Sequence, residues 1–107
     1  MGNYQETIEK VISNFSEIVV REGTEVEMIR DREGGHYLVM VVGWQDHIRV
    51  YGRLVHINLK DNKVWIQQDR TDTGIAKELV ELGVPKSNIV LAFKSQFLRK
   101  FTEYAVS

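Results

Sequence analysis

The residues with the clearest capacity for chemistry lie on one predicted β-hairpin. An imidazole acts as a general base when a carboxylate fixes its tautomer. A tight turn at Asp61-Asn62 would set Leu54 opposite Asp69 and His56 opposite Gln67, so that His56 and Asp69 share a face. No activated nucleophile or oxyanion loop can be named beside them. We therefore favour a hydrogen-bonded surface pair over a catalytic pair.

The same face predicts a protein-binding surface. The hairpin sets Trp65 opposite Asn58, and a tryptophan among hydrogen-bonding groups is typical of interface anchors. The predicted contact residues are His56, Asn58, Trp65, Gln67 and Asp69. An alternative stays open, in which a helix or the C-terminal segment of the same chain covers Trp65, because large exposed apolar patches are uncommon on monomers.

A second candidate surface interleaves basic and aromatic side chains near the C-terminus. Lys94, Arg99 and Lys100 could contact phosphates, and the neighbouring rings could stack on bases. Three basic side chains are few for binding driven by contacts to phosphates, however. Aromatic residues at 93, 97 and 101 also have the spacing of a helical packing stripe. The packing interpretation is favoured, and direct nucleic-acid binding remains the rival.

Metal and cofactor sites are not predicted. The three histidines, His36, His47 and His56, form no close pair of the kind that marks a metal site, and the chain has no cysteine. Gly34-Gly35 lacks the Lys and Ser or Thr that follow a phosphate-binding loop. The sequence therefore indicates no metal ligand, no cofactor and no nucleotide enzyme.

Composition indicates one globular domain over residues 1–107. Hydrophobic residues make up 43% of the chain and charged residues 27%, which is near the globular average. The formal net charge of -1 supplies no global attraction to nucleic acid or to an anionic membrane. The longest apolar run, 37–42, is too short to cross a bilayer, and no signal peptide is evident, so we expect a cytoplasmic protein.

The elements that must position these residues follow from periodicity. Tyr4, Ile8, Val11, Ile12 and Phe15 predict an N-terminal helix, with Asn3 as its cap and Glu6 able to reach back to it. Runs 25–30, 36–44, 48–59 and 64–69 predict a four-stranded antiparallel meander.

The remainder of the chain predicts further helix and strand. Asp72 or Thr73 caps a second helix that ends at Gly83, before Pro85. A strand over 89–93 and a short helical turn capped by Ser95 come next. The predicted class is α+β.

The hairpin formed by the predicted strands 48–59 and 64–69 separates apolar from polar side chains if its strands pair without interruption. A turn at Asp61-Asn62 pairs Lys60 with Lys63, and further along it pairs Leu59 with Val64, Ile57 with Ile66 and Val55 with Gln68. The aliphatic side chains then gather on one face, which we expect to pack against the helices.

Four segments resemble the XisI family of excision controlling factors. In order they are VGWQDHIRVYGRLVHINL, KVWIQQD, GIAKELVELGVPKSNIVLAF and RKFTEYAV, and together they span most of the chain. The resemblance implies a small α+β protein without assigned catalytic residues. It also implies a regulatory role in excising a DNA element, beside a site-specific recombinase and the companion protein XisH.

The resemblance leaves three roles open. One is binding to an XisH-like protein, another is direct DNA binding, and the third is antitoxin-like inhibition of an XisH-like nuclease. A homo-oligomer is compatible with all three, and the sequence does not set the oligomeric state.

Overall fold

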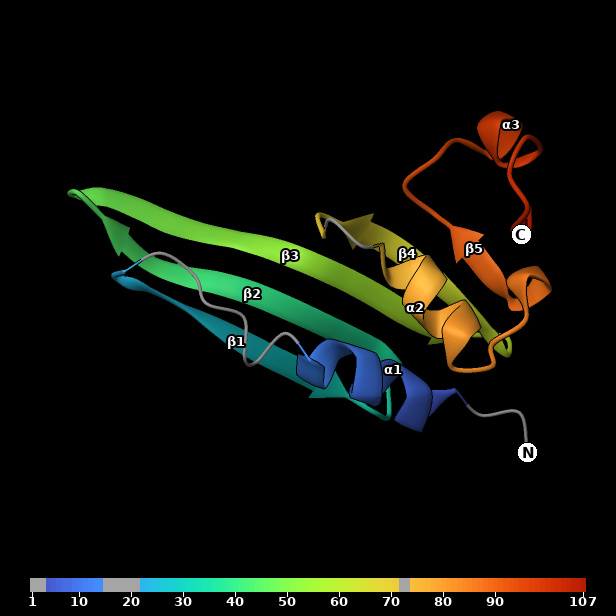
Figure 1. The fold of residues 1–107 in the computed structure, drawn as a ribbon, viewed down its shortest axis with the longest axis horizontal. Coiled ribbons are helices and arrows are strands. Elements are labelled where there is room, and N and C mark those ends of the chain that lie inside the picture. Colours follow the sequence, from blue (N-terminus) through green and yellow to red (C-terminus); the bar gives the residue numbers. More distant parts are fainter. Residues whose placement is uncertain (1–3, 15–21, 72–73) are drawn as a thin grey trace.

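The computed structural model describes residues 4–14, 22–71 and 74–107 and confirms the α+β class. A five-stranded sheet in the order β1-β2-β3-β4-β5 carries the helices (Figure 1). Its strands are β1 (Thr24–Asp31), β2 (His36–Gln45), β3 (Ile48–Lys60), β4 (Lys63–Asp69) and β5 (Ile89–Leu91). The first four form the predicted antiparallel meander, whereas β5 pairs with β4 in parallel, so the sheet is mixed.

Tight turns set the meander. Asp46 and His47 adopt φ of 48° and 71°, and Asp61 and Asn62 adopt φ of 55° and 60°. Asp and Asn tolerate this left-handed backbone well, and two such residues in succession match the right-handed twist of the flanking strands. The predicted reversal at Asp61-Asn62 is confirmed.

Two helices cover one face of the sheet. α1 (Gln5–Ser13) and α2 (Ile75–Glu81) lie on the same side of the strands (Figure 1). Their buried side chains join those of the strands in one core, which comprises Ile8, Val11, Ile12, Tyr37, Val39, Val55, Ile57, Val64, Ile66, Ile75, Leu79, Val84, Ile89 and Leu91. The apolar stripe predicted for the first helix is confirmed for Ile8, Val11 and Ile12, and Tyr4 packs against this core. Phe15 and Asn3 lie outside the described residues.

The chain after α2 returns to the far edge of the sheet. A 3₁₀ turn, η2 (Lys86–Asn88), leads into β5, and the predicted helical turn is α3 (Gln96–Arg99). Ser95 caps α3 as predicted, accepting a hydrogen bond from the Leu98 amide at 3.3 Å. Ala105 then bridges Val90 in parallel, with its amide 2.8 Å from the Ile89 carbonyl oxygen. The C-terminal segment is therefore held beside β5.

The third hairpin departs from its predicted register at one point. Pairing follows the prediction from Lys60↔Lys63 to Ile57↔Ile66, and a β-bulge then shifts it. His56 pairs with Gln68 rather than Gln67, and Val55 pairs with Asp69 rather than Gln68. The prediction was wrong here because an extra residue on β4 opposes one position of β3 and reverses the parity of the pairs beyond it.

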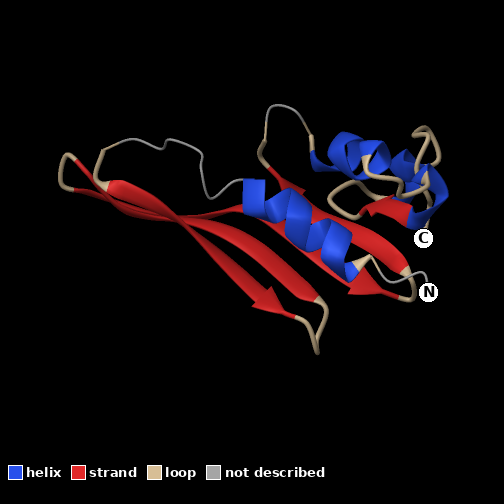
Figure 2. Cartoon of the chain, turned by 60° about the horizontal axis from the view of Figure 1, so that its bottom comes forward, coloured by secondary structure: helices blue, strands red, loops and turns tan. Residues whose placement is uncertain are grey.

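Three strands project beyond the helices as an arm. A second bulge lies between Val39 and Met40, where β2 and β3 enter this region. We define the arm as residues Thr24–Glu27, Met40–Gln45 and Ile48–Arg53. Figure 2 shows its β2–β3 end extending past α1, and the longest dimension of the molecule is 43 Å.

Candidate partner-binding surface

His56 and Asp69 lie on opposite faces of the sheet. The bulge turns Asp69 toward the helices, level with the buried Val55. There its Oδ2 accepts a hydrogen bond from the Ile75 amide at 2.7 Å, and its Oδ1 accepts from the amide and hydroxyl of Thr71 at 2.9 and 2.5 Å. Asp69 thus satisfies an amide at the start of α2. The predicted sharing of a face by these two residues was wrong.

The described residues at the N-terminus of α2 provide a cap that the sequence did not predict. Gly74 occupies the N-cap position, and Asp72 and Thr73 lie outside the described residues. The carboxylate of Asp69, six positions before Ile75, supplies the acceptor instead. Only the strand bulge brings it there, so a search for a local capping motif would not find it.

The face of the sheet opposite α1 and α2 carries His36, His56, Asn58 and Trp65. Asn58 pairs with His36 on β2 and with Trp65 on β4, and the Asn58 amide nitrogen contacts Nδ1 of His36. The rings of His36 and His56 have centroids 6.3 Å apart. Burial lowers the pKa of His56 from its ordinary value of 6.5, and the charges of His36 and Arg53 lower that pKa further. Gln67, the extra residue at the bulge, is exposed.

Trp65 is half-buried, partly by its own chain. Its Nε1 donates to the Lys60 carbonyl oxygen at 3.3 Å, and the Lys60 ammonium lies 5.0 Å from the ring centroid. The guanidinium carbon of Arg99, from α3, lies 6.0 Å from the same centroid. The alternative in which the C-terminal segment covers Trp65 is therefore met in part.

Arg99 holds the C-terminal segment together. Its guanidinium donates to the carbonyl oxygens of Lys94, Val106 and Ala92 at 2.9, 3.1 and 3.3 Å. The Arg99 side chain is therefore hydrogen-bonded to backbone atoms of the C-terminal segment to which it belongs. Of the three bases considered for nucleic-acid contact, Lys94 and Lys100 instead place their ammonium groups 5.7 and 5.6 Å from the ring centroids of Phe93 and Phe97.

Aromatic residues near the C-terminus face outward. Three phenylalanines and one leucine are between 50% and 74% exposed: Phe93, Phe97, Leu98 and Phe101. We call these four side chains the C-terminal aromatic patch, after its three rings. Phe97 and Phe101 meet edge to face with ring centroids 5.5 Å apart. The favoured interpretation of a packing stripe was wrong, because Phe93, Phe97 and Phe101 are all exposed and lie outside the core.

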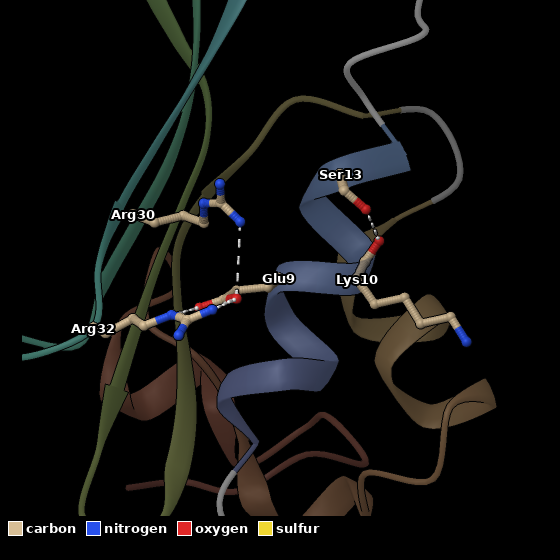
Figure 3. Close-up of polar contacts among 5 residues, drawn as sticks. All are labelled: Glu9, Lys10, Ser13, Arg30 and Arg32. Atoms are coloured by element: carbon tan, nitrogen blue, oxygen red, sulfur yellow. Dashed lines mark hydrogen bonds and ion pairs between the residues drawn. The ribbon is translucent and has the colours of Figure 1, made fainter.

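Glu9 shows an interaction that periodicity alone did not reveal. Its carboxylate forms a two-pronged pair with Arg32, at 2.7 and 2.8 Å, and lies 3.9 Å from Arg30 (Figure 3). The hydrogen bonds from Arg32 lower the pKa of Glu9 below its ordinary 4.5. The contact ties α1 to β1 and to the turn after it. Its partners lie 21 and 23 residues away along the chain, beyond the reach of a helical pattern.

Two negative findings apply to residues 4–14, 22–71 and 74–107. No three His, Asp or Glu side chains among them gather as the ligands of a metal ion would. No helix formed by them has the length and hydropathy needed to cross a membrane.

Comparison with known proteins places the chain in a family. The model of the family described as XisI protein matches residues 1–106. The chain belongs to the XisI family. The family membership expected from the four segments is thereby confirmed.

Solved structures of XisI-like proteins share this fold. A XisI-like protein from Anabaena variabilis ATCC 29413 superposes with a TM-score of 0.91 at 41% identity, over 97% of this chain and 96% of that one. The fdxN element excision controlling factor XisI from the same organism superposes with a TM-score of 0.84 at 26% identity, over the same shares of the two chains. None of the curated proteins compared with the chain matches it.

Proposed function

We propose that this chain is a non-enzymatic accessory protein that acts in the cytoplasm in the excision of a DNA element, by binding a partner protein. Its XisI family membership and its likeness to an fdxN element excision controlling factor support the excision role. The non-enzymatic part rests on Asp69, whose carboxylate caps α2 and so does not orient His56. An XisH-like protein is the proposed partner, and a site-specific recombinase is the other candidate.

The C-terminal aromatic patch carries the binding proposal. Four large apolar side chains within nine residues are half exposed or more. Aromatic residues at a surface are the usual anchors of protein interfaces, where the partner removes them from water. Trp65, with His56, Asn58 and Gln67, extends the proposed contact from α3 onto the sheet.

Paired substitution in the patch tests this function. Phe97→Ala with Phe101→Ala should weaken binding to a purified XisH-like protein roughly 30-fold, since interface anchors contribute about 2 kcal/mol or more. Isothermal titration measures the change. Ile48→Ala is the matched control, because it removes an exposed apolar side chain at the far end of the arm. Unchanged affinity in the paired variant would remove the patch as the binding surface.

A separate substitution tests the part of the surface on the sheet. Trp65→Ala should lower the same affinity about 10-fold if the partner reaches past Arg99 onto β4. Full affinity in this variant, together with a loss in the patch variant, would confine the contact to the C-terminal segment.

The DNA-cleavage activity of the partner shows whether binding inhibits it. If the chain acts as an antitoxin-like inhibitor, its addition should suppress DNA cleavage by the XisH-like protein, and the patch variant should fail to do so. Cleavage that continues at saturating concentrations of this chain would leave an accessory role without inhibition.

Nucleic-acid binding is the second candidate, because the aromatic rings beside Lys94 and Lys100 are exposed and so accessible to bases. Stacking on such rings beside basic groups is how single strands are bound without sequence preference. A gel shift with single-stranded DNA at low salt should then be lost in the Lys94→Gln, Lys100→Gln variant. No shift with the parent protein, even at low ionic strength, would end this candidate.

A further inference from the structure

The arm has a face that the helices leave uncovered. Val26 and Met28 pack against the core on the helix side, opposite Val41 and Val39 on β2. Alternation then places Glu25, Glu27, Met40, Val42 and Trp44 on the other face. Their partners on β3 lie there too, since Met40 pairs with Arg53, Val42 with Tyr51 and Trp44 with Arg49.

This helix-free face of the arm is apolar along its centre. Trp44 is 56% exposed and Tyr51 is 70% exposed. The guanidinium carbon of Arg49 lies 5.4 and 5.8 Å from the centroids of the two rings, which places all three side chains together. Such a cluster beside Val42 has the composition of an interface core.

Charge is arranged in rows on either side of this centre. β1 contributes exposed Glu25 and Glu27, and β3 contributes exposed Arg49 and Arg53. Glu27, Met40 and Arg53 are level with one another across the three strands. Across this face, the β1 row is therefore acidic, the β2 row is apolar and the β3 row carries the basic side chains.

That order makes the face complementary to itself in only one of two simple orientations. If two copies stack about a two-fold axis parallel to the strands, β1 of each lies over β3 of the other, and acid meets base. If the axis runs across the strands, β1 lies over β1, and acid meets acid. Like charges brought together at an interface oppose association, so the first orientation is favoured.

We propose that two copies of this chain form a dimer by stacking the helix-free faces of their arms about an axis parallel to the strands. Glu27 of each copy then lies over Arg53 of the other, and the Trp44 and Val42 side chains of the two copies pack in the centre. Sheets stacked in this way lie about 10 Å apart with their side chains interdigitated. Each C-terminal aromatic patch, on a segment outside the arm, stays open to another protein.

Charge reversal gives a direct test. Glu27→Arg alone sets two arginines over each other at both symmetric contacts, and Arg53→Glu alone sets two carboxylates there. Each variant should raise the dimer dissociation constant at least roughly 10-fold. Mixed in equal amounts, the two variants should form a heterodimer, because every such contact then joins an arginine to a glutamate. Sedimentation equilibrium distinguishes a monomer of 12.4 kDa from a species of twice that mass.

Controls separate this arrangement from its rivals. Ile48→Ala, on the helix side of the arm, should leave dimerisation intact. In a Trp65→Phe background, dilution should shift Trp44 emission to longer wavelength as the indole becomes hydrated. A parent protein that stays monomeric at about 100 µM would overturn the proposal, and so would single reversals that dimerise as well as the parent. The test does not involve an excision partner, so its outcome is independent of the proposed function.

Discussion

Asp69 illustrates, at the scale of a residue, how a carboxylate that sequence suggests for binding or catalysis is engaged by the fold. Its two oxygens accept three hydrogen bonds, one of them from the first amide of α2. Gly74, at the N-cap position of this helix, has no side chain that could accept a hydrogen bond. Asp69 therefore joins the end of β4 to the start of α2.

Asp69→Ala should lower the free energy of unfolding by about 1–2 kcal/mol, because it removes the acceptor from the α2 terminus. Asp69→Asn retains one carbonyl oxygen, so its free energy of unfolding should lie between those of the parent and of Asp69→Ala. Urea denaturation measures the change, with Gln67→Ala, an exposed neighbour at the bulge, as the control. Equal stability of Asp69→Ala and the parent would contradict the capping role.

His56 should make stability depend on pH. Because its pKa is lowered in the folded protein, the unfolded chain binds more protons just below pH 6.5. The free energy of unfolding should therefore fall as the pH drops from 6.5, and His56→Gln should flatten this slope between about pH 7 and 5.5. Gln67→Ala, at an exposed position that does not titrate, is the control. The contribution of Glu9 is lost only below its ordinary pKa of 4.5, outside this window.

At the scale of elements, the turn between β1 and β2 depends on Gly35. Gly35 is buried with φ of 73°, its amide donates to the Asp31 carbonyl oxygen, and its own carbonyl oxygen accepts from the Leu59 amide at 2.8 Å. A Cβ at this position would collide with the Leu59 carbonyl oxygen. The turn thus packs directly against β3, and only glycine satisfies both constraints.

Gly35→Ala should cost about 2 kcal/mol or more of stability, because it combines a left-handed backbone with a clash against another strand. Gly52→Ala is the matched control: a Cβ there meets no atom within 4 Å, and we expect a change below about 0.5 kcal/mol. Thermal unfolding of the two variants side by side measures the difference. Similar melting temperatures would show that the turn yields to the substitution.

At the scale of the whole molecule, contacts between distant segments close the fold around the sheet edge. The Tyr4 hydroxyl lies 2.6 Å from the Asn88 amide nitrogen, joining the N-terminal helix to η2. Lys86 pairs with Glu103 at 2.8 Å, and Lys63 contacts the Ser107 carbonyl oxygen. The C-terminal segment is thus tied to β4 and β5 while Arg99 lies beside Trp65.

Removal of residues 103–107 should expose Trp65, because it deletes the bridge at Ala105 and the Val106 acceptor of Arg99. In a Trp44→Phe background, Trp65 emission should move to longer wavelength and acrylamide should quench it more strongly. Phe101→Ala within the full chain should leave both unchanged. An unaltered spectrum after truncation would mean that Arg99 stays in place without the segment.

Local chemistry in the sequence determined the order of elements, the reversal at Asp61-Asn62 and the apolar faces, since turn residues and periodicity act over a few positions. The family was also recognisable from four segments. Only the tertiary structure decided that Asp69 caps a helix, that the C-terminal rings face outward and that Glu9 pairs with Arg32. A bulge changes which face of the sheet the following side chains point to, and no residue type in the sequence predicts its position. Burial depends on which elements pack together across the sheet. Those outcomes are set by long-range packing, which no short window of sequence contains.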